Sequence, residues 1–135
     1  MGCRLCEVYC RAEHSQSKDL VKALRKESPQ VLPRVCVEVK PPDSFAVQCR
    51  HCTEAPCVSA CLTGALQKDT ETGIVSVDAE KCMGCWTCIL ACPFGAISRD
   101  TRRGKIVKCD LCKGKDMPVC VANCPNEAMV YAEAK

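Results

Sequence analysis

The run KCMGCWTCILACP, residues 81–93, constrains the fold of this chain more than any other stretch. In the spacing C-x2-C-x2-C-x3-C-P it carries Cys82, Cys85, Cys88 and Cys92. This is the spacing of bacterial iron–sulfur ligation, in which three thiolates hold one cluster and the fourth ligates a second cluster. A single run of this kind therefore implies a partner run elsewhere in the chain.

Three further runs vary the same pattern. The upstream run has a slightly longer middle loop and consists of Cys49, Cys52, Cys57 and Cys61. The downstream run has an insertion after its second cysteine and consists of Cys109, Cys112, Cys120 and Cys124. The opening run, MGCRLCEVYC, matches residues 83–92 at Met, Gly and three cysteines, which are Cys3, Cys6 and Cys10. The counterpart of Cys82 would precede Met1, so we expect the N-terminus to be truncated by one ligand.

Sixteen cysteines in 135 residues indicate either a disulfide scaffold or a metal scaffold. The ligand spacing favours metal, and no basic region followed by an apolar one opens the sequence, so we expect a reduced, cytoplasmic protein. No apolar stretch is long enough to span a bilayer, and no direct membrane insertion is expected. Because only five residues are aromatic, a conventional core would be thin. We predict that the chain without iron is unfolded.

The formal net charge of +3 assumes neutral thiols. Four clusters held by thiolates would change the total to about −5, so the basic composition is no argument for nucleic acid. Cationic side chains near the runs have two interpretations: they offset cluster charge and raise reduction potentials, or they are the solvated surface of a hairpin. These side chains are Lys81, Arg99, Arg102, Arg103, Lys105, Lys108 and Lys113.

The segment between the first two runs predicts one helix and one strand. The helix begins with Ser17 as its N-cap and ends at Pro29. Its apolar face consists of Leu20, Val21 and Leu24. Residues 32–40 alternate around β-branched side chains, which predicts a strand closed by Pro41 and Pro42.

Three residues near the runs carry expectations of their own. Cys36 has no cysteine neighbour at ligand spacing, so we predict a core position, although it is also the spare thiol that could fill the missing ligand position. Trp86 lies between two ligands and either shields a cluster from water or simply packs. His51 is expected to hydrogen-bond its own loop or a cluster sulfur.

An internal repeat follows the cysteine runs. Cys61 and Cys92 each precede a Gly-Ala-apolar strand, a polar turn (TETG or TRRG) and a return strand. Cys124 precedes PNEAMVYAE, which predicts the same strand without a return. The predicted fold class is α+β, with duplicated bacterial ferredoxin-like (βαββαβ-type) units of cluster loop, short helix and hairpin.

We expect a single domain over residues 1–135. Its central two-cluster half covers about residues 45–100, and its outer two-cluster half combines residues 1–44 with residues 101–135. No linker longer than residues 38–44 is expected.

The four runs, in this order and over nearly the whole chain, resemble the polyferredoxin subunits of bacterial and archaeal redox enzymes. The segments CRLCEVYCRAEHSQSKDL, QCRHCTEAPCVSACLTGA and KCMGCWTCILACPFGAI are most similar to the iron–sulfur protein that partners nickel carbon monoxide dehydrogenase. The resemblance implies an electron-transfer subunit of anaerobic metabolism with four [4Fe-4S] clusters, and no catalytic residues of its own. Its implied partners are a catalytic oxidoreductase and a second redox protein. The first would be carbon monoxide dehydrogenase-like, or a tungsten or molybdenum aldehyde or formate oxidoreductase, and the second a hydrogenase or a flavin–NAD(P)H oxidoreductase.

The resemblance also implies which cysteines hold each cluster. The cluster 1 set is Cys49, Cys52, Cys57 and Cys92. The cluster 2 set is Cys82, Cys85, Cys88 and Cys61. The cluster 3 set is Cys109, Cys112, Cys120 and Cys10. The cluster 4 set is Cys3, Cys6 and Cys124, with one ligand missing, so this site is expected to hold an incomplete cluster, a [3Fe-4S] cluster, or none unless another ligand completes it. Crossed ligation of this kind would hold neighbouring clusters at short, fixed separations, as in a wire.

Other functions have less support in the sequence. The alternative is an iron–sulfur redox sensor, but no helix-turn-helix pattern or aromatic-interleaved basic surface indicates nucleic-acid binding. Zinc explains the runs poorly, because zinc sites use paired C-x2-C knuckles. An independent enzyme would have only an open iron at Cys3 and Cys6 as its catalytic position, and no constellation of Glu, His or Ser supports it.

Overall fold

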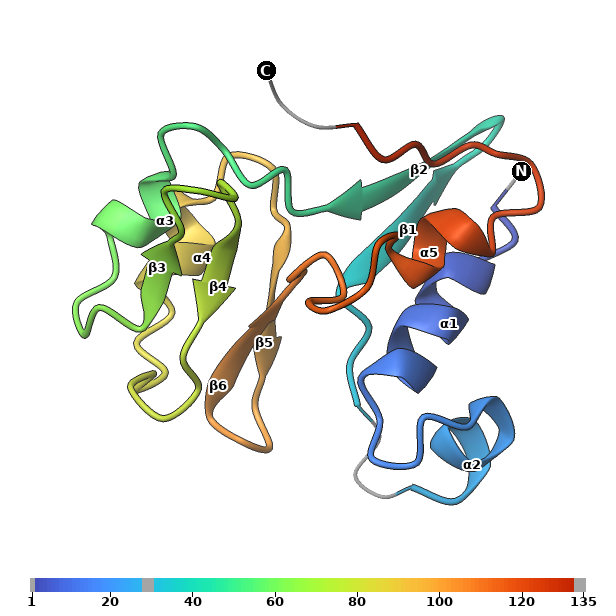
Figure 1. Cartoon of the computed structure of the whole chain (residues 1–135), viewed down its shortest axis with the longest axis horizontal. Coiled ribbons are helices and arrows are strands. Elements are labelled where there is room, and N and C mark those ends of the chain that lie inside the picture. Colours follow the sequence, from blue (N-terminus) through green and yellow to red (C-terminus); the bar gives the residue numbers. More distant parts are fainter. Residues whose placement is uncertain (1, 28–30, 133–135) are drawn as a thin grey trace. The chain divides into compact units, whose positions relative to one another are not determined.

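Short helices and two-stranded sheets make up the computed structural model of the chain, which describes residues 2–27 and 31–132 (Figure 1). This arrangement confirms the mixed α+β class. Met1, before which the missing ligand is expected, and Pro29, the predicted helix end, lie outside the described residues. Within that described part, no helix is both long and apolar enough to cross a lipid bilayer.

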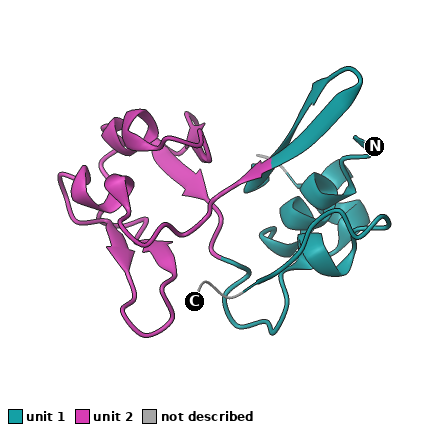
Figure 2. Ribbon diagram, turned by 90° about the horizontal axis from the view of Figure 1, so that it is seen from above, with its two compact units in different colours: residues 1–46, 111–135 teal, residues 47–110 magenta. Residues whose placement is uncertain are grey.

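The chain folds into two compact units (Figure 2). Unit 1 consists of residues 1–46 and 111–135, and unit 2 of residues 47–110. The assignment of two clusters to each predicted half stays a prediction.

Unit 2 contains two antiparallel hairpins at the predicted positions. In the first, β3 (Leu66–Lys68) pairs with β4 (Val75–Val77). In the second, β5 (Ile97–Asp100) pairs with β6 (Lys105–Lys108). The turns have the same chemistry, because the carboxylates of Asp69 and Asp100 each accept backbone N–H groups from the residues two and three positions on. An Asp that accepts hydrogen bonds in this way satisfies the backbone N–H groups of a short polar turn without contacts from other elements.

Two short helices of unit 2 follow the cluster loops, α3 (Pro56–Ser59) and α4 (Thr87–Ala91). Each carries the third cysteine of its run, and the fourth cysteine follows four residues later. The hairpins pack on these helices around Leu66 and Val75, which are almost fully buried. The buried core of unit 2 consists of Cys57, Ala65, Leu66, Val75, Cys82, Cys88, Ile97 and Ile106.

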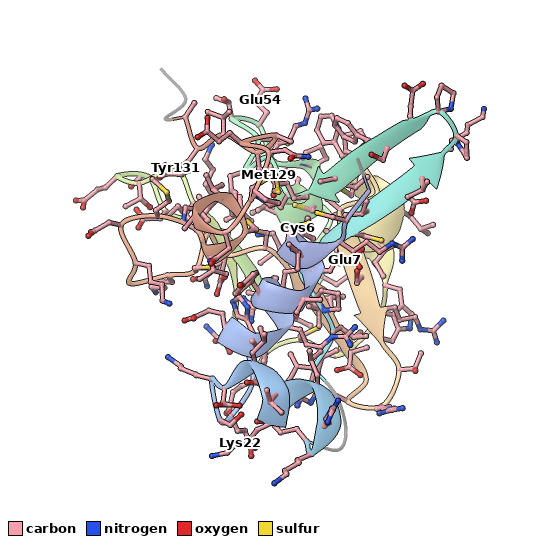
Figure 3. The ribbon with its side chains drawn as sticks, turned by 90° about the vertical axis from the view of Figure 1, so that its right-hand side faces the viewer. Cys6, Glu7, Lys22, Glu54, Met129 and Tyr131 are labelled. Carbon is pink, nitrogen blue, oxygen red and sulfur yellow. The ribbon has the colours of Figure 1, made fainter. Side chains whose placement is uncertain are left out.

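Unit 1 is arranged around its first helix. The elements of this unit are α1 (Leu5–Glu13), α2 (Leu20–Arg25), β1 (Val35–Lys40), β2 (Asp43–Gln48, which continues into unit 2) and α5 (Val119–Ala122). Helix α1 packs on α5, on α2 and on β1. The Glu7 carboxylate accepts the Val37 backbone N–H at 2.6 Å and so joins α1 to β1 (Figure 3). The buried core consists of Cys6, Cys10, Val35, Val37, Cys120 and Met129.

The predicted start of the second helix is wrong. Helix α2 begins at Leu20, and its N-cap is Asp19, whose carboxylate accepts the Lys22 N–H at 2.9 Å. The predicted apolar face is also wrong, since Ala23 is 1% exposed whereas Val21 is 58% exposed. Ser17 lies before the helix, and its backbone N–H donates to the Glu27 carboxylate at 2.8 Å.

Three other expectations are corrected. Cys36 is exposed, because it points to the face of β1 opposite the buried Val35 and Val37. Residues 38–44 are no linker, since they form the end of β1, the turn and the start of β2. Residues 125–132 form no strand, although Met129 is buried, and backbone N–H groups at the start of this segment bond to Cys124 in place of a neighbouring strand.

Candidate metal centres

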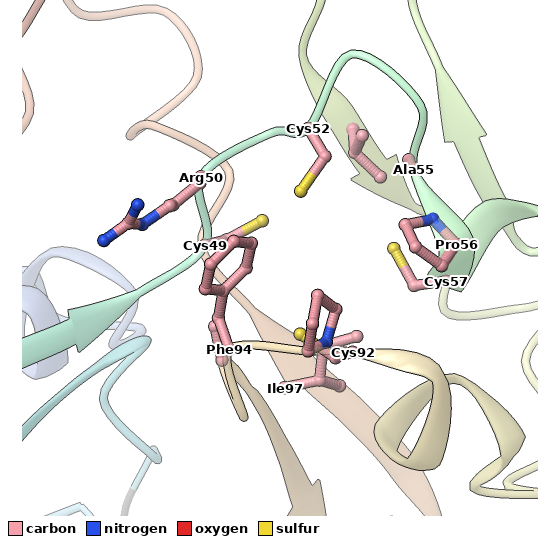
Figure 4. Close-up of a pocket in the computed structure, with 12 residues that line it drawn as sticks. Cys49, Arg50, Cys52, Ala55, Pro56, Cys57, Cys92, Phe94 and Ile97 are labelled. Carbon is pink, nitrogen blue, oxygen red and sulfur yellow. The ribbon is translucent and has the colours of Figure 1, made fainter.

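A pocket in unit 2 is lined by all the cysteines of the cluster 1 set (Figure 4). They come from the loop after β2, from α3 and from the end of α4, and are Cys49, Cys52, Cys57 and Cys92. In Figure 4 the Cys52 and Cys57 sulfurs are turned toward the same space. Most of the other lining residues are apolar: Ala55, Pro56, Val75, Pro93, Phe94, Ala96 and Ile97.

The thiols of this pocket affect one another. Burial raises the pKa of the Cys57 thiol, and the neighbouring thiolates of Cys49 and Cys92 raise it further. Deprotonated together, they would repel one another in a poorly solvated space. Binding of iron would offset this repulsion between thiolates, because a metal-bound thiol is deprotonated and its negative charge is paired with the metal.

The cysteines of the cluster 2 set are also brought together. Burial raises the pKa of the Cys88 thiol to about 11, with further increases from Cys61, Cys82 and Cys85. Cys82 and Cys88 are buried, whereas Cys85 is exposed. This group combines three cysteines of one run with the fourth cysteine of another.

The loop that carries Cys82 and Cys85 has an unusual backbone. Gly84 has φ +73°, and a Cβ there would collide with the Gly104 carbonyl oxygen of the β5–β6 turn. Trp86 has φ +63°, and the Arg99 guanidinium lies 4.5 Å from the centroid of its ring. Two left-handed residues allow the chain to wrap tightly between its ligands. Both interpretations of Trp86 stay open.

In unit 1, cysteines of the cluster 3 and cluster 4 sets share one core. Cys6 and Cys10 on α1 lie in the same buried cluster as Cys120 on α5, and Cys124 packs against it. Burial raises the pKa of Cys6, with smaller contributions from Glu7 and Cys3. Of the other cysteines in these sets, Cys3 is exposed, Cys112 is buried, and Cys109 is the penultimate residue of unit 2.

Backbone N–H groups point at several cysteine sulfurs. Arg34 donates to Cys10 Sγ at 3.2 Å. At 3.5 Å, His51 donates to Cys49 Sγ and Leu66 to Cys61 Sγ. Hydrogen bonds to ligand sulfurs help to set the reduction potential of an iron–sulfur cluster. These donors could not be predicted from the sequence, because every residue except proline has a backbone N–H group.

Lysine ammonium groups hold the carbonyls of three cysteines in unit 2. Lys68 Nζ donates to Cys52 O at 3.0 Å. Lys105 Nζ donates to Cys82 O, and Lys108 Nζ donates to Cys109 O at 2.7 Å. Lys105 and Lys108 are therefore bound to the loops and do not belong to a solvated hairpin surface. The solvated interpretation suits the exposed members of the same group, which are Lys81, Arg99, Arg102, Arg103 and Lys113.

His51 bonds to β4 and not, through its side chain, to its own loop. Its Nδ1 accepts the Val75 N–H at 2.9 Å. Burial, with Lys108 nearby, lowers the pKa of His51 to about 4, so the ring is neutral and Nε2 carries the proton. Nε2 is buried and has no hydrogen-bond partner among the described residues. Its proton is thus available to an acceptor outside the protein chain.

The donor set fits an iron–sulfur cluster. In the described ranges, no three His, Cys, Asp or Glu side chains converge closely enough to hold a single metal ion. The four thiols of the pocket instead border a shared apolar space. Several soft thiolates around such a space suit a cluster of irons, which is larger than one ion.

Comparison with known proteins gives a consistent result. The family model of the 4Fe-4S dicluster domain matches residues 42–134. Electron transport protein HydN of Escherichia coli K12 is 38% identical over 149 aligned positions, which cover 98% of this chain and 82% of HydN. Thiosulfate reductase electron transfer subunit PhsB of Salmonella typhi is 33% identical, over 97% of this chain and 69% of PhsB. The polyferredoxin-like subunit of the aliphatic sulfonate oxidoreductase of Pyrococcus furiosus is 42% identical, over 91% of this chain and 65% of that subunit.

Proposed function

This chain belongs to the 4Fe-4S dicluster, ferredoxin-like family of electron-transfer proteins, and from this premise we propose that it relays single electrons between a catalytic oxidoreductase and a second redox protein. The relatives are named as an electron transport protein, an electron transfer subunit and a polyferredoxin-like subunit, which supports a relay without catalysis of its own. The observation that carries the proposal is the pocket in which four thiols from two runs meet.

The proposed cofactors are four [4Fe-4S] clusters, of which the one at Cys3, Cys6 and Cys124 is incomplete or completed by another ligand. When bound, each cluster supplies a site that accepts and releases one electron. The shared pocket supports the cluster 1 set. The mutual effect of thiolates on the pKa of Cys88 supports the cluster 2 set. For the remaining clusters, the ligand sets implied by the resemblance are our proposal.

The chain's own residues would do three things for a bound cluster. Thiolates hold it, and the apolar lining of the pocket excludes water from the cluster 1 site. Backbone N–H groups of His51 and Leu66 stabilise negative charge on ligand sulfurs. Lysine ammonium groups fix the loop carbonyls, so the ligands keep their positions as charge changes.

The finer identity of the partners is also part of the proposal. The resemblance favours a carbon monoxide dehydrogenase-like enzyme, or a tungsten or molybdenum aldehyde or formate oxidoreductase. A hydrogenase or a flavin–NAD(P)H oxidoreductase would be the second partner, in the cytoplasm. The relatives themselves are named as subunits of a thiosulfate reductase and of an aliphatic sulfonate oxidoreductase, so one family serves several catalytic partners.

Iron and acid-labile sulfide per chain, read with EPR of the oxidised and the dithionite-reduced protein, test the cofactor. Four cubanes give about 16 iron, and an incomplete fourth site gives about 12 to 15. Reoxidation of the reduced chain by a one-electron acceptor tests the relay. We expect about three to four electrons per chain, one for each cluster. A chain that binds no sulfide, or that returns no electrons, contradicts the proposal.

Crossed ligation is tested by Cys92→Ser. Because Cys92 lines the pocket with Cys49, Cys52 and Cys57, its loss should alter the EPR signal of the cluster 1 site and reduce the iron there, although Cys92 belongs to the other run. Cys36→Ser is the matched control for this site, since Cys36 is exposed on β1 and does not line the pocket, and it should leave the EPR signal of the cluster 1 site unchanged. An unchanged cluster 1 signal in Cys92→Ser would contradict the assignment of Cys92.

A further inference from the structure

Lys108 is a buried cation in the core of unit 2. The residue is 3% exposed, although lysine is almost never fully buried unless its ammonium is paired. Its Nζ donates to the carbonyl oxygens of Val75 and Cys109, the latter at 2.7 Å. These hydrogen bonds hold the ammonium at a defined position with little access to water.

This ammonium lies beside the lining of one predicted cluster site and beside the first cysteine of another run. Val75 lines the pocket of the cluster 1 set, and its carbonyl is one of the two acceptors. The other acceptor belongs to Cys109, the first ligand of its own run. The positive charge of Lys108 also acts on a thiol of the pocket. It lowers the pKa of Cys57, whereas burial raises that pKa.

Two ionisable side chains lie near this charge. His51 lies close to Lys108 and is neutral at neutral pH. Asp110, two residues after Lys108, acts on the pKa of His51 in the direction opposite to Lys108. Charges in a poorly solvated interior interact more strongly than charges at the surface.

We propose that Lys108 is a positioning residue that sets the reduction potential of the adjacent cluster sites through a fixed, buried positive charge. This inference rests on the proposed function, because it requires clusters at these cysteines. Reduction adds one electron and one negative charge to a site, and no proton or bond moves at Lys108. The ammonium stabilises the reduced form more than the oxidised form, so it raises the potential.

Lysines that hold other loops are less suited to this role. Lys68 and Lys105 also donate to cysteine carbonyls, but both are partly exposed, so water screens their charge. Lys81 is next to the ligand Cys82 in sequence, yet it is exposed and paired with Asp78 at 3.5 Å. Lys81 is therefore a matched control with the same charge beside a ligand.

The experiment compares Lys108→Gln and Lys108→Met with Lys81→Met in the full, iron-loaded chain. Gln keeps an N–H donor and removes the charge, whereas Met removes both. Each variant is assayed for iron, for sulfide and by an EPR-monitored redox titration. For both Lys108 variants, we expect at least one reduction step to become about tenfold less favourable, which is about 59 mV for a one-electron couple. Lys81→Met should leave every step at its wild-type potential.

The outcomes separate the possible roles. Wild-type potentials in iron-replete Lys108→Gln and Lys108→Met would overturn the inference while leaving the proposed function intact. If neither variant binds iron, Lys108→Arg decides: assembly with wild-type potentials supports the requirement for charge, and failure to assemble shows a purely structural role. A wild-type chain without clusters would refute the proposed function itself.

Discussion

Gly84 and Gly95 have similar backbone conformations but different surroundings. Their φ angles are +73° and +61°. A Cβ on Gly84 would strike the backbone of Gly104, whereas a Cβ on Gly95 would meet nothing within 4 Å. The loop between Cys82 and Cys85 thus packs directly on the β5–β6 turn. A side chain at Gly84 would displace either this loop or the turn.

Gly84→Ala should therefore destabilise the chain more than Gly95→Ala. Both substitutions strain a left-handed backbone, which costs about 1 kcal/mol. Gly84→Ala adds a backbone collision, for a total of about 2–4 kcal/mol. Thermal unfolding of the iron-loaded variants, with iron content, measures the difference. Equal midpoints would show that the loop is not seated on the turn.

At the scale of residues, the sequence predicts which side chains are ligands better than it predicts which side chains are buried. Spacing led to the runs of cysteines, because ligand geometry limits how far apart ligands lie in the chain, and the family resemblance grouped the four that line the pocket. Exposure of Cys36 could not be read from composition, since it depends on which face of β1 meets the core. Burial of Lys108 was equally hidden, because one of its two acceptors is the carbonyl of Val75, which is distant in sequence.

At the scale of elements, local signals were the most reliable guide. Both hairpins of unit 2 form where the polar turns predict them, since each turn bonds to its own Asp. Helix α2 was misplaced because Ser17 and Asp19 are both good caps, and only contacts within unit 1 decide between them. The segment after Cys124 has a strand-like composition and no strand partner, so it stays irregular over residues 125–132.

Glu7 is predicted to hold α1 against β1. Glu7→Ala leaves the Val37 N–H without its acceptor, and a hydrogen bond to a charged group contributes about 1.5–3 kcal/mol. Glu7→Gln keeps an oxygen acceptor and should lose less stability. Hydrogen exchange at the Val37 amide should be faster in Glu7→Ala than in Glu7→Gln. Equal exchange in both variants and the wild type would show that β1 is held by apolar packing alone.

At the scale of the whole molecule, cysteines take the place of a conventional core. Cysteines make up part of both buried clusters, in unit 1 and in unit 2. Within residues 2–27 and 31–132, the largest side chains that are almost fully buried are Leu66 and Val75. A core of this size depends on cross-links of some kind, as other small domains do.

Removal of iron should consequently unfold the chain. Without iron, the thiols are unligated, and the folded chain loses the free energy that metal binding contributes to folding. Circular dichroism of the chelated chain under reducing conditions should show no cooperative thermal transition, and the iron-loaded chain should show one. A sharp transition in iron-free protein would mean that the apolar contacts suffice.

The last turn of α4 has a consequence for how the protein is made and how it fails. Cys88 lies among the thiols of one site, and Cys92, one helical turn later, lines the pocket of the other. A rotation of this helix that improves one site must disturb its neighbour. Under the proposed ligation, the two sites of unit 2 share this one short helix, so loss of the cluster at one site would also shift a ligand of the other.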